Sequence, residues 1–83
     1  MEKRIGTVII GIDNRESAPS VNAIISKHSN IVIGRLGLPR NEGMSLINLV
    51  VEGTTDEIGS LTGQLGKVEG IEVKSAVLPV VAM

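Results

Sequence analysis

Four short segments rich in Ile, Val and Leu predict four β-strands. The predicted strands are Arg4–Ile12, Ile31–Leu38, Met44–Glu52 and Ile71–Leu78. The second and third are separated by the turn-forming residues Pro39–Gly43, a length that suits a hairpin loop. Because proline has no N–H to donate to a neighbouring strand, we expect Pro79 to end the fourth strand and the apolar tail Val80–Met83 to trail from it.

Between these strands, two segments have hydrophobic residues three and four positions apart, which is the period of an amphipathic helix. The residues at this spacing form one stripe along each predicted helix. They are Val21, Ile24, Ile25 and His28 in the first segment, and Ile58, Leu61, Leu65 and Val68 in the second. Asp13 with Glu16, and Thr54 with Glu57, have the spacing of a capping box at a helix start. Gly70 suits a position just beyond the second helix.

The predicted order of elements is therefore β-α-β-β-α-β. Two right-handed β-α-β units joined by a hairpin form a four-stranded antiparallel sheet with both helices on one face. We expect a ferredoxin-like α+β fold in which residues 1–83 make up a single domain.

Three glycines interrupt the second predicted helix at helical spacing. At 100° per residue, Gly59, Gly63 and Gly66 point roughly 160° away from the apolar stripe. Each internal glycine costs a helix about 0.8–1.0 kcal/mol relative to alanine. Small residues at this spacing let another backbone approach closely, which predicts a contact surface for a second copy. A solvent-exposed face that tolerates glycine is the alternative.

The predicted sheet has hydrophobic residues on both faces. In the third strand, Ile47, Leu49 and Val51 alternate with a second set that includes Leu46 and Asn48. A two-layer domain covers one sheet face, and an uncovered apolar face usually marks an interface. We therefore expect Leu46 and Asn48 to lie in the interface of a homo-oligomer, either a dimer or a tetramer.

Composition supports self-association and narrows the classes of function. The 83 residues (8.7 kDa) include no Phe, Tyr, Trp or Cys, so the core consists of aliphatic side chains and has no disulfide to reinforce it. The lack of cysteine excludes thiolate zinc sites, cysteine-held iron–sulfur clusters and a cysteine nucleophile. A net charge of −1 and the lack of aromatic residues argue against direct binding of nucleic acid.

The sequence shows no pattern typical of a signal peptide or of a membrane-spanning segment. The segment MEKRIGTVII leads into a short apolar run without a small-residue cleavage site, which is unlike a signal peptide. No apolar run approaches the ~20 residues that span a bilayer. We expect a cytoplasmic, soluble protein that does not bind membranes.

Several motifs resemble one protein family. TTDEIGSLTGQLGKVEGIEVKSAVL (Thr54–Leu78) resembles the signature of the small iron-only hydrogenase system regulators. The opening MEKRIGTVIIGIDNRESAPSVNAIIS and the GLP turn at Gly37–Pro39 resemble the same family, so the resemblance covers almost the whole chain. It implies an ACT-like domain that stands alone, forms homo-oligomers and has a regulatory rather than a catalytic role.

The wider ACT-like resemblance implies a place for a small effector. In amino-acid-binding ACT domains, the loop after the first strand helps to form the effector pocket. The corresponding residues here are Gly11, Ile12, Asp13, Asn14 and Arg15, although the usual Asp-x-Pro-Gly pattern is missing. The fold is also similar to the regulatory domain of nickel-responsive repressors, which need several His and a Cys. Since His28 is the one histidine and cysteine is absent, we expect no metal site and no cofactor.

Other interpretations of these residues remain open. The polar cluster from Asp13 to Glu16 could receive an anion on backbone N–H groups, or could simply cap a helix. Arg15 and Asn48 resemble the Arg and Asn of acylphosphatases, small hydrolases of similar fold, although the glycine-rich loop of that family is missing here. A purely structural oligomer without a ligand is a third possibility.

Overall fold

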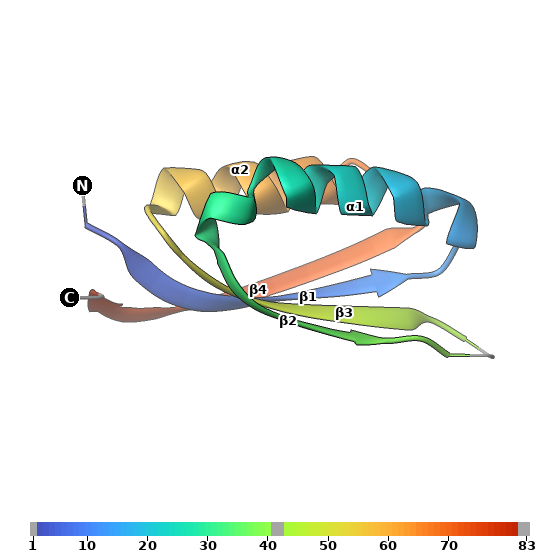
Figure 1. The fold of residues 1–83 in the computed structure, drawn as a ribbon, viewed down its shortest axis with the longest axis horizontal. Helices are drawn as coiled ribbons and strands as arrows, with labels where there is room; N and C mark the ends of the chain where they lie inside the picture. Colours follow the sequence, from blue (N-terminus) through green and yellow to red (C-terminus); the bar gives the residue numbers. More distant parts are fainter. Residues whose placement is uncertain (1, 41–42, 82–83) are drawn as a thin grey trace.

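The computed structural model describes residues 2–40 and 43–81. Its elements are β1 (Arg4–Ile12), η1 (Arg15–Ser17), α1 (Ala18–Lys27), η2 (Ser29–Ile31), β2 (Val32–Leu38), β3 (Ser45–Gly53), α2 (Thr55–Gly66) and β4 (Ile71–Val81). The four strands pair antiparallel in the order β2-β3-β1-β4, and both helices lie on one face of the sheet (Figure 1). The predicted ferredoxin-like α+β fold is confirmed.

The hydrophobic core fills the space between this sheet face and the two helices. Its members are Val8, Ile10 and Ile12 of β1, Ile47, Leu49 and Val51 of β3, Val21 and Ile25 of α1, Ile31 of η2, and Ile58, Leu61 and Leu65 of α2. All are aliphatic. Alternate residues of β1 and β3 therefore point into the core, and the residues between them point to the opposite face.

The two helices begin differently. The capping box predicted at the start of α2 is confirmed, because the Thr54 N–H donates to Glu57 Oε1 at 2.9 Å and the Glu57 N–H donates to Thr54 Oγ1 at 3.1 Å. The capping box predicted at Asp13 is wrong. The Asp13 N–H donates to the Gly70 carbonyl oxygen at 2.9 Å, which ties Asp13 to the turn before β4. The cap lies one residue later, where Asn14 Oδ1 accepts from the Glu16 N–H and opens η1.

The prediction that Pro79 ends the fourth strand is also wrong, since β4 continues to Val81. The reason is the position of β4 at an edge of the sheet, where proline is tolerated because one side of the strand has no neighbour. The pairing of β1 with β4 also shifts register between Arg4 and Gly6, so the ladder is irregular there. The tail residues 82–83 lie outside the described residues.

The turn before β4 differs slightly from expectation. Helix α2 ends at Gly66, so Val68 packs against the core from beyond the helix. Gly70 follows with a φ of +76°, a left-handed conformation that glycine adopts without strain. A Cβ at Gly70 would lie 3.0 Å from Asn14 Cβ, so this turn packs directly against the first loop.

Candidate functional site

The sheet face opposite the helices carries mostly apolar side chains on β1, β2 and β3. Lys74 and Glu72 of β4 lie on the same face, opposite Ile9 and Gly11 in the strand register. No described segment lies over this face in the ribbon of Figure 1. Its large exposed side chains are Ile9 of β1, Leu36 and Leu38 of β2, Val50 of β3 and Leu78 of β4. We call these five residues the open-face cluster. Their alternation with core residues places them on the outer side of all four strands.

Asn48 is a polar residue inside this apolar surface, as the sequence predicts. It lies between Ile9 of β1 and Leu36 of β2 in the cross-strand register. The Thr7 hydroxyl donates to Asn48 Oδ1 at 2.6 Å, with the Leu49 carbonyl oxygen at 3.2 Å as its other acceptor. Thr7 was not anticipated from the sequence. Thr7 lies on β1, two residues before Ile9, which is the residue opposite Asn48. Hydrophobic periodicity does not give the register of two strands, so it could not bring Thr7 and Asn48 together.

The open face also holds a shallow apolar hollow of about 340 Å³. Its walls include Ile5 and Thr7 of β1, Val50 of β3, and Ala76 and Leu78 of β4. Two of the lining residues, Gly6 and Ala76, are small, and Ala76 lies opposite Thr7 in the strand register. Sequence reasoning missed this feature, although the single alanine between Ser75 and Val77 is visible in the chain.

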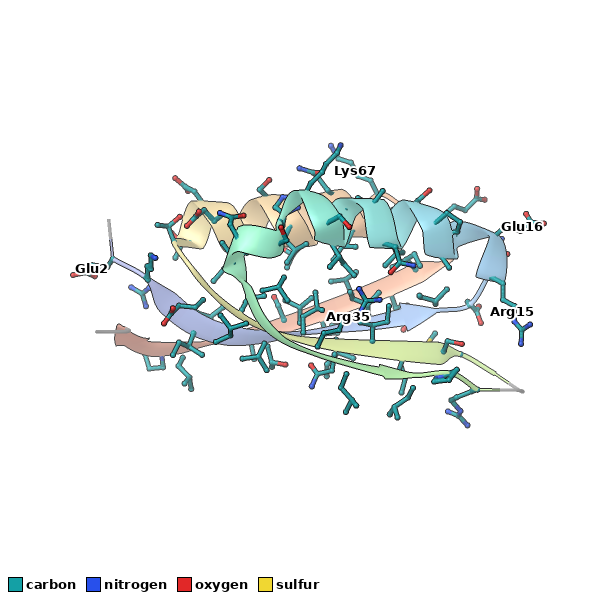
Figure 2. The ribbon with its side chains drawn as sticks, in the orientation of Figure 1. Glu2, Arg15, Glu16, Arg35 and Lys67 are labelled. Carbon is teal, nitrogen blue, oxygen red and sulfur yellow. The ribbon has the colours of Figure 1, made fainter. Side chains whose placement is uncertain are left out.

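The first loop does not gather the predicted effector-binding residues in one place. Of the five residues predicted to bind an effector, Gly11 and Ile12 are buried, while Asp13, Asn14 and Arg15 are exposed. The Met44 side chain occupies the space over Gly11 that a Cβ would fill. Figure 2 shows Arg15 pointing away from the body of the protein at the end of the sheet. The five residues therefore do not converge on one cavity.

Beside this loop lies a cleft of about 230 Å³, and Ile12 is the predicted residue that lines it. Leu46, predicted at the interface, lines it as well, together with Leu38 and Pro39 from the end of β2. Asn22 of α1 forms another wall, and its Oδ1 accepts a hydrogen bond of 2.8 Å from Arg35 on β2. The cleft combines an apolar floor with an amide and a neighbouring guanidinium.

The glycine face of α2 points outward. Gly59, Gly63 and Gly66 are exposed, and no described atom outside the helix and its immediate neighbours lies within 4 Å of a Cβ placed on any of them. Gly59 also borders a groove of about 420 Å³ between α2 and β4, with Thr62 and Val77 among its other walls. These glycines therefore serve no packing role within the described part of the chain.

His28 joins the two helices. Since a carbonyl oxygen can only accept, the His28 ring donates from Nδ1 to Ile24 O at 2.7 Å, and its Nε2 forms a hydrogen bond of 3.1 Å with the Ser60 hydroxyl. The Ser60 oxygen in turn accepts from the Gln64 amide at 3.1 Å. Within residues 2–40 and 43–81, no three His, Asp or Glu side chains are grouped as metal ligands.

Arg15 and Asn48, which suggested a hydrolase, lie on different parts of the fold. Arg15 is in η1, beyond the end of β1, whereas Asn48 is paired with Ile9 in the middle of the sheet. Asn48 Oδ1 accepts from Thr7, and none of the hydrogen bonds among the described residues joins Asn48 to Arg15. The geometry gives no phosphate site built on this pair.

Comparison with known proteins identifies the family. Residues 4–75 match the TM1266-like family, described as "Iron-only hydrogenase system regulator, putative". The chain belongs to this family. A member, the uncharacterized protein TM1266 from Thermotoga maritima, has a solved structure that is 34% identical and superposes with a TM-score of 0.88. The match covers 93% of this chain and 99% of that one.

More distant solved structures share the fold. The ACT domain from GTP pyrophosphokinase of Chlorobium tepidum is 23% identical with a TM-score of 0.73, over 92% of this chain and 100% of that one. The apo form of CPII from Thiomonas intermedia K12, a nitrogen regulatory PII-like protein, is 13% identical with a TM-score of 0.57, over 98% and 95%. None of the curated proteins matches the chain. No helix of the described residues has the length and apolar character needed to cross a bilayer.

Proposed function

We propose that this protein is a non-enzymatic regulatory domain of an iron-only hydrogenase system. It works as a homo-oligomer, a dimer or a tetramer, and responds to a small effector or a protein partner. Membership of the regulator family and the ACT-like fold support the regulatory role. The observation that carries the proposal is the open-face cluster, because a group of exposed apolar side chains on one face usually marks a surface that binds another protein.

The size of this surface is in the range that association needs. Each side chain of the open-face cluster is roughly half exposed, and two facing copies would cover ten of them. Since fully burying one such side chain is worth about 1.5–3 kcal/mol, covering the exposed halves contributes roughly 10 kcal/mol. Association costs about 4–15 kcal/mol in lost freedom of motion. The open face therefore favours self-association, and further contacts are needed to make it tight.

The effector site stays a proposal built on the first loop. The cleft beside Ile12 offers an amide at Asn22 and an apolar floor at Leu46, which suits a small polar molecule with an apolar part. Ligand binding there would bias one packing arrangement of the subunits over another, because it lies where β2 and the first loop meet. The cytoplasmic location and the single-domain organisation also remain predictions from the sequence.

Two measurements on the purified protein test this function. Native mass spectrometry of protein from its own host reports subunit number and any retained ligand together. Light scattering on Ile9→Lys then tests the open face, with Ala23→Lys on the exposed surface of α1 as the matched control. We expect Ile9→Lys to lower the mass and Ala23→Lys to leave it unchanged. A single-chain mass for the unmodified protein would overturn the proposed oligomer.

A binding screen separates a regulator from a purely structural oligomer. We expect at least one amino acid or nucleotide to raise the melting temperature, and an Asn22→Ala variant to lose that shift. A screen without any shift would instead favour an oligomer that binds no small molecule. Turnover of an acyl phosphate that disappears in Arg15→Ala would contradict the non-enzymatic assignment.

A further inference from the structure

We propose that the groove between α2 and β4 is a second binding site, and that it takes a small aliphatic monocarboxylate without an ammonium group. The groove holds about 420 Å³, which is within the range of small-molecule sites. It is lined by Arg4, whereas the cleft beside the first loop is lined by Ile12, at the opposite end of β1. Neither the proposed oligomer nor the first-loop effector is needed for this second site.

The floor of the groove is apolar because α2 leaves the outer end of β4 partly uncovered. Val77 is opposite Gly6 in the strand register, and Gly6 is on the same side of the sheet as Val8. Val8 is fully buried, whereas 40% of Val77 remains exposed. Ile58 of α2 forms the other part of the floor. An apolar floor in a concave groove suits the carbon chain of a ligand.

Gly59 keeps the groove open along α2. Thr55, Gly59 and Thr62 line it at intervals of four and three residues, so they share one side of the helix. Gly59 is exposed, and apart from the neighbouring helix backbone no described atom lies within 4 Å of a Cβ placed on it. A longer side chain at this position would extend over the groove. The missing side chain therefore leaves room for a ligand.

Arg4 supplies a positive charge beside the start of α2, since it is opposite Gly53 in the strand register. It is the one charged residue among the described residues that line the groove. Its Nη1 donates to the Pro79 carbonyl oxygen at 3.4 Å, which is long for a hydrogen bond, and a carbonyl oxygen does not neutralise the guanidinium charge. A guanidinium has five N–H donors and binds a carboxylate through two parallel hydrogen bonds. Arg4 is therefore suited to hold a carboxylate in the groove.

The surroundings of Arg4 favour a ligand with one negative charge over a ligand with two. Asp56 and Glu57 are both in the first turn of α2. The Thr54 N–H and hydroxyl, and after them the Lys3 ammonium, hold the pKa of the Glu57 carboxyl below its ordinary value. These groups, rather than Arg4, are the partners of that carboxylate. One carboxylate balances the guanidinium, whereas a phosphate dianion would be repelled by the two acidic residues.

The other polar side chains of the groove are hydroxyls. Thr55, Thr62 and Ser75 line it, and the Thr62 hydroxyl donates to the Gly59 carbonyl oxygen at 3.3 Å. Hydroxyls donate hydrogen bonds to carboxylate oxygens, but they carry no negative charge to hold an ammonium group. An amino acid in the groove would place its ammonium group near the Arg4 guanidinium, and like charges repel. The lining therefore favours a carboxylic acid over the corresponding amino acid.

A ligand in this groove would bridge an irregular part of the sheet. The pairing of β1 with β4 shifts register between Arg4 and Gly6, at the same end of β1 as the groove. A carboxylate held by Arg4, with its carbon chain between α2 and β4, contacts three elements at once. Because the groove exists only in the folded chain, such a ligand should raise the melting temperature.

Amide NMR with three molecules of equal chain length tests the class of ligand. Hexanoate is the carboxylate, hexanol is its neutral counterpart, and norleucine is the same acid with an added ammonium group. We expect hexanoate to shift the amide signals of Gly59, Thr62 and Ser75 along a saturating curve. Hexanol and norleucine should bind about tenfold more weakly or less, because one lacks the ion pair and the other adds a like charge. Binding of either as tight as that of hexanoate, or no shift of these signals by hexanoate, would overturn the proposal.

Two matched pairs of variants test the residues of the groove. Arg4→Gln removes the guanidinium charge, and Lys67→Gln removes the same charge at the far end of α2, where the side chain points away from the sheet (Figure 2). Gly59→Leu covers the groove, and Gly63→Leu adds the same side chain to an exposed glycine that does not line it. We expect Arg4→Gln and Gly59→Leu each to weaken hexanoate binding about tenfold or more. Lys67→Gln and Gly63→Leu should each leave it within about twofold.

The contrary results are equally specific. Equal losses within either pair of variants would show a general effect of charge or of the helix surface, and would overturn the site. Hexanoate shifts confined to Asn22 and Leu46 would place the ligand in the first-loop cleft, which overturns the groove and leaves the proposed effector site standing. The absence of any hexanoate binding would leave the proposed oligomer standing, because the open-face cluster is on the other side of the sheet. The amide spectrum of each variant shows whether its fold is retained.

Discussion

The two faces of the sheet are built from neighbouring residues and have different tasks. Ile10 is fully buried beneath the helices, whereas Ile9, the residue before it, is 48% exposed on the opposite face. Both are isoleucines on β1, one of the two inner strands of the sheet, so residue type cannot tell them apart. The difference teaches that the covered face holds the chain folded, while the open face is available for association.

The largest effect separates these two residues directly. Ile10→Ala should lower the free energy of unfolding by about 2–5 kcal/mol, because it removes buried methylene groups and leaves a cavity. Ile9→Ala, measured by urea denaturation at high dilution, should cost far less, since half of its side chain is already in water. Equal losses from both variants would mean that the two faces do not differ in the way described.

A smaller effect concerns the polar group at the centre of the open face. Thr7→Val removes the hydroxyl that donates to Asn48 Oδ1. In the separated subunit, water replaces that donor at little cost. In an oligomer that covers the open face, the unpaired amide should weaken association by about 1–3 kcal/mol. Light scattering of the variant across a dilution series measures the change in association. An association constant equal to that of the unmodified protein would show that Asn48 remains in contact with water in the oligomer.

The outer surface of α2, where the three exposed glycines lie, is a third surface whose role in association can be compared with that of the two sheet faces. Gly63→Ala should raise the free energy of unfolding of dilute protein by about 0.8–1.0 kcal/mol, because a Cβ there meets no described atom and improves helix propensity. If the predicted glycine contact with a second copy exists, the same variant weakens self-association. Stabilisation without any change in association would assign Gly59, Gly63 and Gly66 to a solvent-exposed face.

The smallest expected effect is a pH dependence of the free energy of unfolding, which arises from Glu57 in α2. The backbone N–H of Thr54, and then its hydroxyl, hold the pKa of the Glu57 carboxyl below its ordinary value. A depressed pKa means that the carboxylate stabilises the fold fully above the ordinary pKa of about 4.3, and this contribution is lost as the pH falls through the lowered value. Urea denaturation of Glu57→Gln should lack that pH dependence. Its self-association should be unchanged, since Glu57 lies away from the open face.

Much of this fold follows from local pattern. The bounds of β1, the capping box at Thr54 and the two-sided apolar character of β3 are all visible in the sequence. Each depends on residues close together in the chain, whose preferences agree with the final structure.

What the sequence could not give depends on position in the sheet. Pro79 lies inside β4 because that strand is at an edge, and strand order is a tertiary property. The shift of the cap from Asp13 to Asn14 depends on a hydrogen bond to Gly70, which is distant in the chain. The residues Gly11–Arg15, expected to bind an effector, are divided between buried and exposed positions, because Gly11 and Ile12 belong to β1 and the other three lie beyond its end. Local motifs do not report which groups the fold has already engaged.

Sedimentation velocity of the unmodified protein over a wide dilution series tests self-association most directly. We expect a species whose mass is a whole multiple of 8.7 kDa, and which gives way to the single chain when the protein is diluted. A single chain of 8.7 kDa at every concentration would contradict it.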